Sequence, residues 1–496
     1  MFKPHVFLFG ATLCLHVSLG QSFEAPTWTF PTGEPIFGTP ALEDKTTLYL
    51  PTEGIDSNLG SVIALDISGE TPSQLWKFTT DDWIDSAPAQ GSDGTLYVGS
   101  WNGVLYAINQ ETGAEVWNFD TESIIVASPA VAEDGTIIFP AYDGFLYALN
   151  PDGTEKWATF IGAEMDSSPS LDESGGIYVG TYDGTLIALD SNGNQVWEFT
   201  ADTVDGTDER ILASPAITLD GQIIFGSGNG YVYALDQATG TENWKTQFPE
   251  EVDSSPVLDD SDNIYFGTRS GFLVKLDSFG TEQWSVELGD IFFSSPVIDT
   301  KGNTYVVAFS GNNTSSLYAF DTKGQTLATA TFDGLVDASP VITPDGRLIV
   351  CTLSGDVLSF YTGFGLSPTG WPKFGFNLAN SANSAGSTTP SGLIAFFDAW
   401  EDLGSGWNEV EWFELFNSDN FPWIYHFDYE WLYLGGPGIS EHWIYQSNLG
   451  WIWTRPDVFP YAFSAANSNW IYLFTDEVGQ PWYFDYADSS WKIFQP

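Results

Sequence analysis

A pair of small residues followed by proline recurs along this chain and constrains its fold more than any other feature. Two of the copies read "EVDSSPV" at 251–257 and "EMDSSPS" at 164–170. Eight copies align on their prolines, at Pro40, Pro88, Pro129, Pro169, Pro215, Pro256, Pro296 and Pro340. The intervals run from 40 to 48 residues, a period typical of a propeller or a solenoid.

Turn signals divide each unit into four short strands. Residues 128–157 contain Asp-Gly pairs that begin at Asp134, Asp143 and Asp152, and the runs "TIIF", "FLYAL" and "TEKW" are rich in β-branched and aromatic residues. Asp-Gly is a strong hairpin-turn signal. Together with the proline segment these runs make four antiparallel strands, whereas a β-solenoid has shorter coils and fewer hairpins. The sequence therefore predicts an all-β protein, an eight-bladed β-propeller of four-stranded blades.

The proline segments are predicted to form the innermost strands. Neighbouring blades come closest there, so only small side chains fit, and proline is tolerated on a free sheet edge because it has no N–H group. The segment "APTWTF" at 25–30 matches the ends of outer strands elsewhere. We expect it to complete the last blade, at 337–361, and so to close the ring and hide two sheet edges.

Two longer motifs resemble those of quinoprotein-type propellers. "AINQETGAEVW" at 107–117 and "ALDQATGTENW" at 234–244 resemble the blade-docking motif of that family, and "DGTLYVGSWNGVLYAIN" at 93–109 resembles its pyrroloquinoline-quinone-like repeat. The resemblance covers residues 25–378. It implies that a tryptophan of each unit packs against the next blade, at Trp76, Trp117, Trp157, Trp197, Trp244 and Trp284. The seventh unit has "TLATATF" at 326–332 instead, so we expect a weaker blade contact there.

The resemblance implies two classes of function. The family includes dehydrogenases that hold pyrroloquinoline quinone on the axis through Ca²⁺. It also includes non-enzymatic propellers such as the lipoprotein that assists outer-membrane β-barrel assembly. This chain has no adjacent cysteine pair, no long loops between blades, and no histidine in residues 21–395, which removes the commonest general base. We predict no catalytic residues, no cofactor and no metal site.

An acidic residue recurs three positions before every second proline. Around the eight units this position reads Phe37, Asp85, Val126, Asp166, Leu212, Asp253, Phe293 and Asp337. One interpretation is structural, in which each aspartate accepts bonds from backbone N–H groups at the start of an innermost strand. The other is functional: a channel-mouth collar that concentrates cations or grips a basic ligand. The segment "DDSDN" at 259–263 lacks the glycine and distal glutamate of an EF-hand loop and is predicted to be a turn.

Charge and targeting signals narrow the partners and the location. With 14 basic and 66 acidic residues the net charge is −52, so the chain repels nucleic acid and we predict no nucleic-acid partner. Residues 1–20 are predicted to be a removed export signal, and no other stretch is long and apolar enough to span a membrane. Cys351 would then be the one remaining cysteine and is expected in the core. We predict a monomer that is periplasmic, cell-surface or extracellular.

The composition changes after the propeller. Residues 379–395 are rich in Ser, Ala and Gly and are predicted to be a linker. Residues 396–496 hold repeated pairs of aromatic runs joined by polar turns, a small aromatic-rich β-hairpin module similar in style to bacterial cell-wall-binding repeats. Its tryptophans either form the core of the module or remain exposed to stack on sugars. The candidate surface aromatics are Trp423, Trp431, Trp443, Trp451, Trp453, Trp470, Trp482 and Trp491.

These features favour an exported, non-catalytic propeller scaffold for protein or ligand binding, at 21–378, whose C-terminal module tethers it to the envelope or to a surface polymer. The partner is an unidentified protein or an envelope polymer. One alternative is a pyrroloquinoline-quinone-dependent oxidoreductase. Another is a carbohydrate-binding cell-surface protein that acts mainly through its C-terminal module.

Overall fold

The structure is a computed structural model of the whole chain. It describes residues 21–23, 25–43, 46–54, 59–204, 207–289, 294–367, 371–375 and 377, and the backbone of further strands between 400 and 493. The predicted export signal and linker lie outside the described residues, as does Phe293. Two compact units divide the chain, 1–385 and 386–496, and each is considered by itself.

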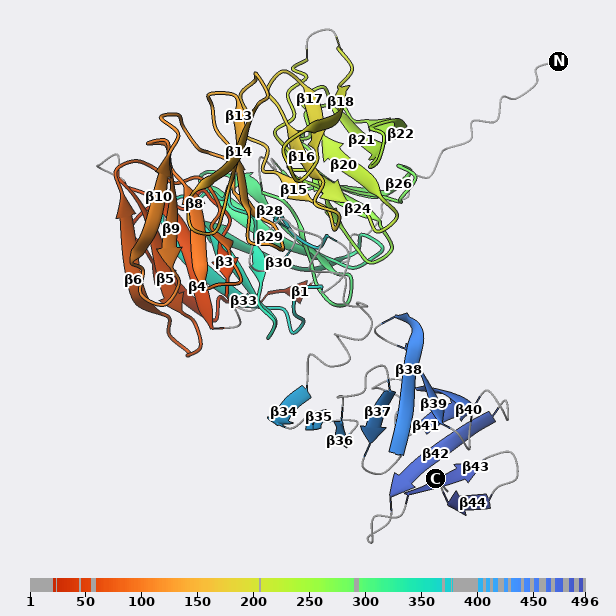
Figure 1. Cartoon of the computed structure of the whole chain (residues 1–496). Helices are drawn as coiled ribbons and strands as arrows, with labels where there is room; N and C mark the ends of the chain where they lie inside the picture. Colours follow the sequence, from red (N-terminus) through yellow and green to blue (C-terminus); the bar gives the residue numbers. More distant parts are fainter. Residues whose placement is uncertain are drawn as a thin grey trace, which may run out of the picture. The chain divides into compact units, whose positions relative to one another are not determined.

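The first unit confirms the predicted eight-bladed propeller. Its described strands form eight sheets, each antiparallel apart from one added edge strand, and the sheets follow one another in chain order from red to teal (Figure 1). Blade 1 contains β3 (Ala41–Leu42), β4 (Thr47–Glu53), β5 (Gly60–Asp66) and β6 (Ser73–Thr80). Blade 2 contains β7 (Ala89–Gln90), β8 (Thr95–Gly99), β9 (Val104–Asn109) and β10 (Glu115–Asp120). Blade 3 contains β11 (Ala130–Val131), β12 (Ile137–Pro140), β13 (Phe145–Leu149) and β14 (Glu155–Phe160).

The same four-stranded order continues around the ring. Blade 4 contains β15 (Ser170–Leu171), β16 (Ile177–Gly180), β17 (Thr185–Leu189) and β18 (Gln195–Thr200). Blade 5 contains β19 (Ala216–Ile217), β20 (Gln222–Gly226), β21 (Tyr231–Asp236) and β22 (Glu242–Gln247). Blade 6 contains β23 (Val257–Leu258), β24 (Ile264–Gly267), β25 (Phe272–Leu276) and β26 (Glu282–Glu287). Blade 7 contains β27 (Val297–Ile298), β28 (Thr304–Gly311), β29 (Thr314–Phe320) and β30 (Thr326–Asp333).

The ring closes with an N-terminal strand, as the sequence predicts. Strand β2 (Trp28–Pro31) pairs antiparallel with β33 (Asp356–Tyr361), next to β32 (Arg347–Cys351) and β31 (Val341–Ile342), and completes blade 8. A second N-terminal strand, β1 (Gln21–Ser22), was not predicted; it pairs parallel with β30 as a fifth strand of blade 7. Two separate hydrogen-bonded strands from the N-terminus therefore hold the last two blades to the start of the chain.

A tryptophan on the outer strand of each of blades 1 to 6 contacts the following blade. Trp76 Nε1 donates to Gln110 O at 2.8 Å, and its indole lies against Gly113, where a Cβ would come within 2.6 Å of the ring. The same two contacts recur at Trp117, Trp157, Trp197, Trp244 and Trp284. Each contacted glycine also has a positive φ, so both the backbone turn and the indole exclude a larger residue.

Blade 7 lacks this tryptophan, and Ala328 occupies the equivalent position on β30. Phe23, which directly follows β1, lies close by, with its ring 6.5 Å from Tyr305 and 5.9 Å from Phe360 of blade 8. Among blades 1 to 7, only blade 7 lacks an aromatic residue at the docking position of its outer strand. The added strand β1 thus brings an aromatic side chain to this interface. Sequence reasoning expected only a weaker contact here.

The structure corrects the position of the innermost strands. They do not include the small-small-proline residues; each is two residues long and begins directly after its proline, as β7 does after Pro88. The small residues before the proline lie in the segment that enters the blade. Close packing near the axis still requires them to be small, but hydrogen bonding adds a second reason.

Hydroxyl groups link the blades near the axis. The backbone N–H of Ser128 donates to Ser168 Oγ in the next blade at 2.9 Å. Six further bonds of 2.9–3.1 Å repeat this pattern, with N–H donors at Ala87, Ser168, Ser214, Ser255, Ser295 and Ser339. The last of them ends on Thr39 Oγ1 in blade 1. The eighth position is Ala87, which has no hydroxyl to accept a bond, so the ring is open between blades 1 and 2.

Apolar side chains fill the space between blades. Strands β20 and β21 of blade 5, for example, contribute fully buried Ile223, Phe225, Tyr233 and Leu235 to a cluster that continues into blades 4 and 6. Cys351 is buried and free, in agreement with its predicted core position, and burial raises the pKa of its thiol. In the part of the chain that the structure describes, no helix has the length and apolarity to cross a membrane.

The second unit contains eleven described strands, each paired antiparallel with the next in chain order. They are β34 (Trp400–Gly404), β35 (Trp407–Val410), β36 (Glu414–Asn417), β37 (Trp423–His426), β38 (Glu430–Gly438), β39 (Glu441–Gln446), β40 (Gly450–Thr454), β41 (Tyr461–Ser464), β42 (Asn469–Thr475), β43 (Pro481–Asp485) and β44 (Ser490–Ile493). The eight candidate tryptophans lie on β37–β40 and β42–β44, but their side chains are outside the description. Their predicted role, as core or as binding surface, stays a prediction.

Candidate functional site

A cavity of about 470 Å³ lies on the propeller axis, and all four predicted collar residues line it. These are Asp85, Asp166, Asp253 and Asp337, which we call the collar. The structure therefore brings together side chains that are separated by more than 250 positions in the sequence. Their convergence follows from the fold, because the same position of every second blade faces the axis.

Hydroxyls of the inter-blade ring and one aromatic ring form the other lining of this cavity, which we call the floor. The hydroxyl position follows each collar position by two residues, so the chain passes from collar to floor before it enters the innermost strand. The floor consists of Thr39, Ser128, Ser168, Ser214, Ser255, Ser339 and Phe374. Phe374 also lines a separate small cavity with Pro129, Pro169 and Pro215, so it borders both cavities.

Apolar residues alternate with the collar aspartates. Phe37, Val126 and Leu212 line the same cavity as the carboxylates, as the sequence pattern predicts; Phe293, the fourth, lies outside the described residues. Like charges are therefore held on alternate blades, where their repulsion is reduced by distance. The wall offers carboxylate oxygens and hydrocarbon surface side by side.

Asp85 lies in a group of acids. Its Oδ2 accepts a bond from Trp101 Nε1 at 2.8 Å, and the Trp101 ring packs edge-on against Trp83 with centroids 5.7 Å apart. Burial, and then a side-chain hydrogen bond with Asp85 and the charges of Asp85 and Asp337, raise the pKa of the nearby Glu53 to about 9. Burial and then Asp85 also raise the pKa of Asp337. The charges near Asp85 are therefore mutually unfavourable.

Asp166 is held by two phenols. Tyr142 donates to its Oδ1 at 2.5 Å and Tyr182 donates to its Oδ2 at 2.6 Å, and the two rings lie edge to face 6.3 Å apart. Burial, and then the Asp166 carboxylate, raise the pKa of Tyr182 to about 12 and that of Tyr142 as well. Both phenols therefore remain protonated donors at neutral pH, and they fix the Asp166 carboxylate.

Asp253 is the collar residue with cations beside it. Its Oδ2 lies 3.5 Å from Arg269 Nη1 and 4.0 Å from Arg210 Nη2, and its side chain is only 4% exposed. Both arginines also bind Glu251, Arg210 at 3.1 Å. Burial and the Glu251 charge raise the pKa of Asp253 to about 6 despite the arginines. The positive charge here is thus shared between two carboxylates.

The partners of the collar come from loop positions that sequence reasoning missed. They share one position in the turn between the second and third strands of a blade. In four blades this position directly precedes an Asn-Gly, Asp-Gly or Ser-Gly pair, and in blade 1 it directly precedes the glycine. The residues are Glu53, Trp101, Tyr142, Tyr182 and Arg269. Each donates its backbone N–H to the residue two positions before the collar position, as Trp101 does to Trp83 O at 3.0 Å. Alignment of the repeats on their turns would have identified the position, although not what each residue contacts.

This geometry corrects the structural interpretation of the aspartates. The described hydrogen bonds of the collar carboxylates come from tryptophan, tyrosine and arginine side chains; none of these bonds comes from a backbone N–H at the start of an innermost strand. Oδ1 of Asp85 and Oδ1 of Asp253 are buried and accept no bond from an N–H or hydroxyl donor among the described residues. The carboxylates are therefore not needed to begin the strands.

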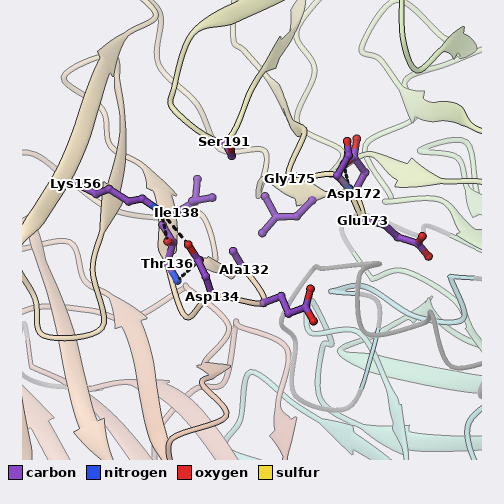
Figure 2. Close-up of a pocket in the computed structure, with 12 residues that line it drawn as sticks. Ala132, Asp134, Thr136, Ile138, Lys156, Asp172, Glu173, Gly175 and Ser191 are labelled. Carbon is purple, nitrogen blue, oxygen red and sulfur yellow. Dashed lines mark hydrogen bonds and ion pairs between the residues drawn. The ribbon is translucent and has the colours of Figure 1, made fainter.

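A second cavity of about 430 Å³ lies between blades 3 and 4. Figure 2 shows Lys156 with its ion pair to Asp134 on one side, and Asp172 and Glu173 on the other. Asp172 accepts bonds from Ser174, Gly176 and Tyr178, so its carboxylate stabilises its own turn. The polar groups at the centre of this cavity are satisfied by each other, and the axial cavity is the stronger candidate.

Acidic residues do not form a metal site in the described part of the chain, where no group of three or more His, Cys, Asp or Glu is placed to hold an ion. The "DDSDN" segment forms the turn that the sequence predicts. Asp259 Oδ1 accepts bonds from the backbone N–H groups of Ser261 and Asn263 at 2.9 and 3.0 Å. Its oxygens are therefore used within the turn.

Together, the eight four-stranded blades, the tryptophan docking contacts and the axial cavity define the class of protein: a pyrroloquinoline-quinone-like β-propeller. The family model described as "Outer membrane protein assembly factor BamB" matches residues 58–260 and 228–363. The chain belongs to this family. No curated protein matches the chain.

Solved structures share the propeller fold. BamB from Moraxella catarrhalis is 18% identical with a TM-score of 0.56, and the match covers 68% of this chain and 99% of that one. A quinohemoprotein alcohol dehydrogenase from Comamonas testosteroni is 16% identical with a TM-score of 0.57, covering 69% and 77%. A europium-containing methanol dehydrogenase is 14% identical with a TM-score of 0.56, covering 69% and 95%. The fold thus occurs in an assembly factor and in dehydrogenases alike.

The lining of the axial cavity does not fit pyrroloquinoline quinone. This cofactor is a tricarboxylate, and its anionic groups need cationic or N–H donors. The axial wall presents four aspartates instead, and the nearby Arg210 and Arg269 are already bound to Glu251. Like charges repel strongly in a partly desolvated space, and no three acids of the described residues are placed to hold a Ca²⁺ ion that could bridge the wall to the quinone.

Proposed function

We propose that this chain is an exported, non-catalytic propeller that binds a ligand or a partner protein through its axial cavity. The observation that supports this proposal is the acidic wall of that cavity, closed below by hydroxyls and Phe374. Concave sites with a few convergent polar groups among apolar ones are typical of binding sites. The tyrosines and tryptophan that hold the collar give it a fixed geometry.

Membership of the BamB family supports a role in the cell envelope. The family name describes an outer-membrane protein assembly factor, so a protein partner in the envelope is the expected kind for this chain. The N-terminal 20 residues support export. The C-terminal aromatic strands, by their tryptophan-rich repeats, support a tether to the envelope or to a surface polymer.

Quinone uptake tests the non-catalytic proposal directly. The purified full chain is mixed with pyrroloquinoline quinone and Ca²⁺, freed of unbound cofactor by gel filtration, and examined for quinone absorbance and alcohol-dependent dye reduction. We expect neither, because the collar repels a polyanion. One quinone per chain together with dye reduction would overturn the proposal in favour of an oxidoreductase.

Retention on insoluble polysaccharides tests the proposed tether. The full chain is compared with a variant that carries Trp443→Ala and Trp453→Ala, which lie opposite each other on β39 and β40. Aromatic stacking on sugars would make the wild-type chain bind more strongly. Equal retention of both proteins on every polymer would count against the tether and leave the axial site unaffected.

A further inference from the structure

The axial cavity has the chemistry of an amine-binding site. On the basis of the proposed function, we propose that the axial cavity binds a primary alkylammonium group. This group belongs either to a free amine or to a lysine side chain of a partner. Asp85 and Asp337 bind the ammonium group, and the alternating apolar residues Phe37 and Val126 contact the methylene chain. The ligand must then carry a positive charge, a requirement that the fold alone does not impose.

The charge balance around the collar favours a cation. Asp85 and Asp337 are close enough to raise the pKa of Glu53, and Asp85 also raises that of Asp337, so carboxyl groups without a cation crowd this side of the cavity. The described arginines near the collar, Arg210 and Arg269, bind on the other side, to Glu251 and Asp253. A bound cation would supply positive charge beside Asp85, as the arginines do beside Asp253.

Unsatisfied oxygens supply a second, independent observation. Oδ1 of Asp253, in a side chain that is 4% exposed, and Oδ1 of Asp85 are buried and accept no bond from an N–H or hydroxyl donor among the described residues. Each of these carboxyls is paired instead with another carboxyl, Glu251 or Glu53. Both aspartates line the axial cavity. A buried carboxylate oxygen without a donor is costly, and an ammonium group carries three N–H donors. The cavity therefore lacks the kind of group that an amine brings.

The size and lining of the cavity distinguish an alkylammonium from a metal ion. A volume of about 470 Å³ is far larger than a single ion needs, and the described acids are not arranged as a metal site. Phe37, Val126 and Leu212 interrupt the oxygens, which suits a ligand that is charged at one end and aliphatic along its length. Trp101 and Tyr142 also line the cavity and can add cation–π attraction.

Calorimetric titration of the full chain tests the inference. The probes are cadaverine as the free amine, the blocked peptide acetyl-Gly-Lys-Gly-amide as the lysine source, and pentan-1-ol as the uncharged control. We expect saturable binding of one or both cationic probes and none of pentanol. Asp85→Asn and Asp337→Asn should each weaken binding about tenfold or more, as loss of one partner of a desolvated charge pair does.

A matched control carries the same charge change elsewhere. Glu287→Gln alters an exposed residue at the end of the outer strand β26 and should leave the affinity unchanged. Circular dichroism melts of all variants establish that they fold. Binding by cadaverine alone assigns a small amine, and binding by the peptide alone assigns a partner lysine; either supports the inference.

Three results would overturn it: neither cationic probe binds, the Asn variants bind as tightly as Glu287→Gln, or pentanol binds as well as cadaverine. Proton release provides a further check, since an ammonium beside Glu53 and Asp337 should lower their pKa values. Titration in two buffers of different ionisation enthalpy should then show protons released on binding. Uptake of pyrroloquinoline quinone would instead overturn the proposed function, so the two failures are distinguishable.

Discussion

The floor and the collar of the axial cavity lie two residues apart in every blade, yet they differ in kind. The floor repeats one interaction, a backbone N–H bonded to the hydroxyl of the next blade, from Ala87 to Thr39 around the ring. The collar repeats a residue type but changes its partner from blade to blade: tryptophan at Asp85, two tyrosines at Asp166, arginines at Asp253. Uniform contacts maintain the ring, whereas varied contacts create a site.

Removal of an arginine beside the collar should give the largest loss of stability among the substitutions considered. Arg210→Met removes one of two cations beside the buried Asp253 and the half-buried Glu251. Leaving buried charges less compensated should lower the free energy of unfolding by about 3 kcal/mol, measured by urea denaturation. Lys156→Met serves as the control, because its partner Asp134 is well exposed and surface ion pairs contribute less than about 1 kcal/mol. Equal losses would show that Asp253 does not depend on Arg210.

Substitutions in the floor should change the free energy of unfolding by smaller amounts, and one should lower it while another raises it. Ser255→Ala leaves the half-buried Ser214 N–H without its acceptor, which should cost about 1 kcal/mol. Ala87→Ser supplies the missing hydroxyl between blades 1 and 2 and should raise the free energy of unfolding by about 1 kcal/mol. Both changes are measured by urea denaturation. A destabilising Ala87→Ser would mean that the gap in the ring is a packing requirement rather than a missing bond.

The repeat explains which of these features could be predicted. Blade number, strand number, closure by 25–30 and the alternation of aspartate with apolar residues all follow from one periodic pattern, and the structure has each of them. The partners of the collar come from a loop position that varies among Glu53, Trp101, Tyr142, Tyr182 and Arg269, so periodicity locates them without revealing their contacts. Phe23 fills the place of a tryptophan that its own blade lacks, a long-range replacement with no local signal.

On the acidic side of the collar, removal of a charge should stabilise the fold. Asp337 has no hydrogen bond or ion pair to another described residue, and its pKa is raised by burial and by Asp85. Asp337→Asn should therefore raise the free energy of unfolding at pH 7 by about 1 kcal/mol. Asp166→Asn should not, because the amide nitrogen cannot accept a bond from the second of its two tyrosines. The comparison by thermal melts would fail if both variants, or neither, were stabilised.

The raised pKa values also predict a pH dependence of stability. Glu53 and Asp253 have folded pKa values of about 9 and about 6, above those of unfolded chains. Between the unfolded and folded values the unfolded state binds fewer protons, so the free energy of unfolding should fall as pH rises from about 4. Glu53→Gln should flatten the melting temperature between pH 6 and 9 (the part of the window that belongs to Glu53). If the melting temperature of Glu53→Gln depended on pH as that of the wild-type chain does, the pKa of Glu53 would not lie in this range.

A crystal structure of the full chain grown with cadaverine tests the central claim most directly. The account predicts one amine nitrogen within hydrogen-bond distance of Asp85 or Asp337, with the pentane chain along Phe37 and Val126 and the floor hydroxyls unmoved. An axial cavity without the amine, while saturating cadaverine is bound elsewhere on the propeller, would contradict it.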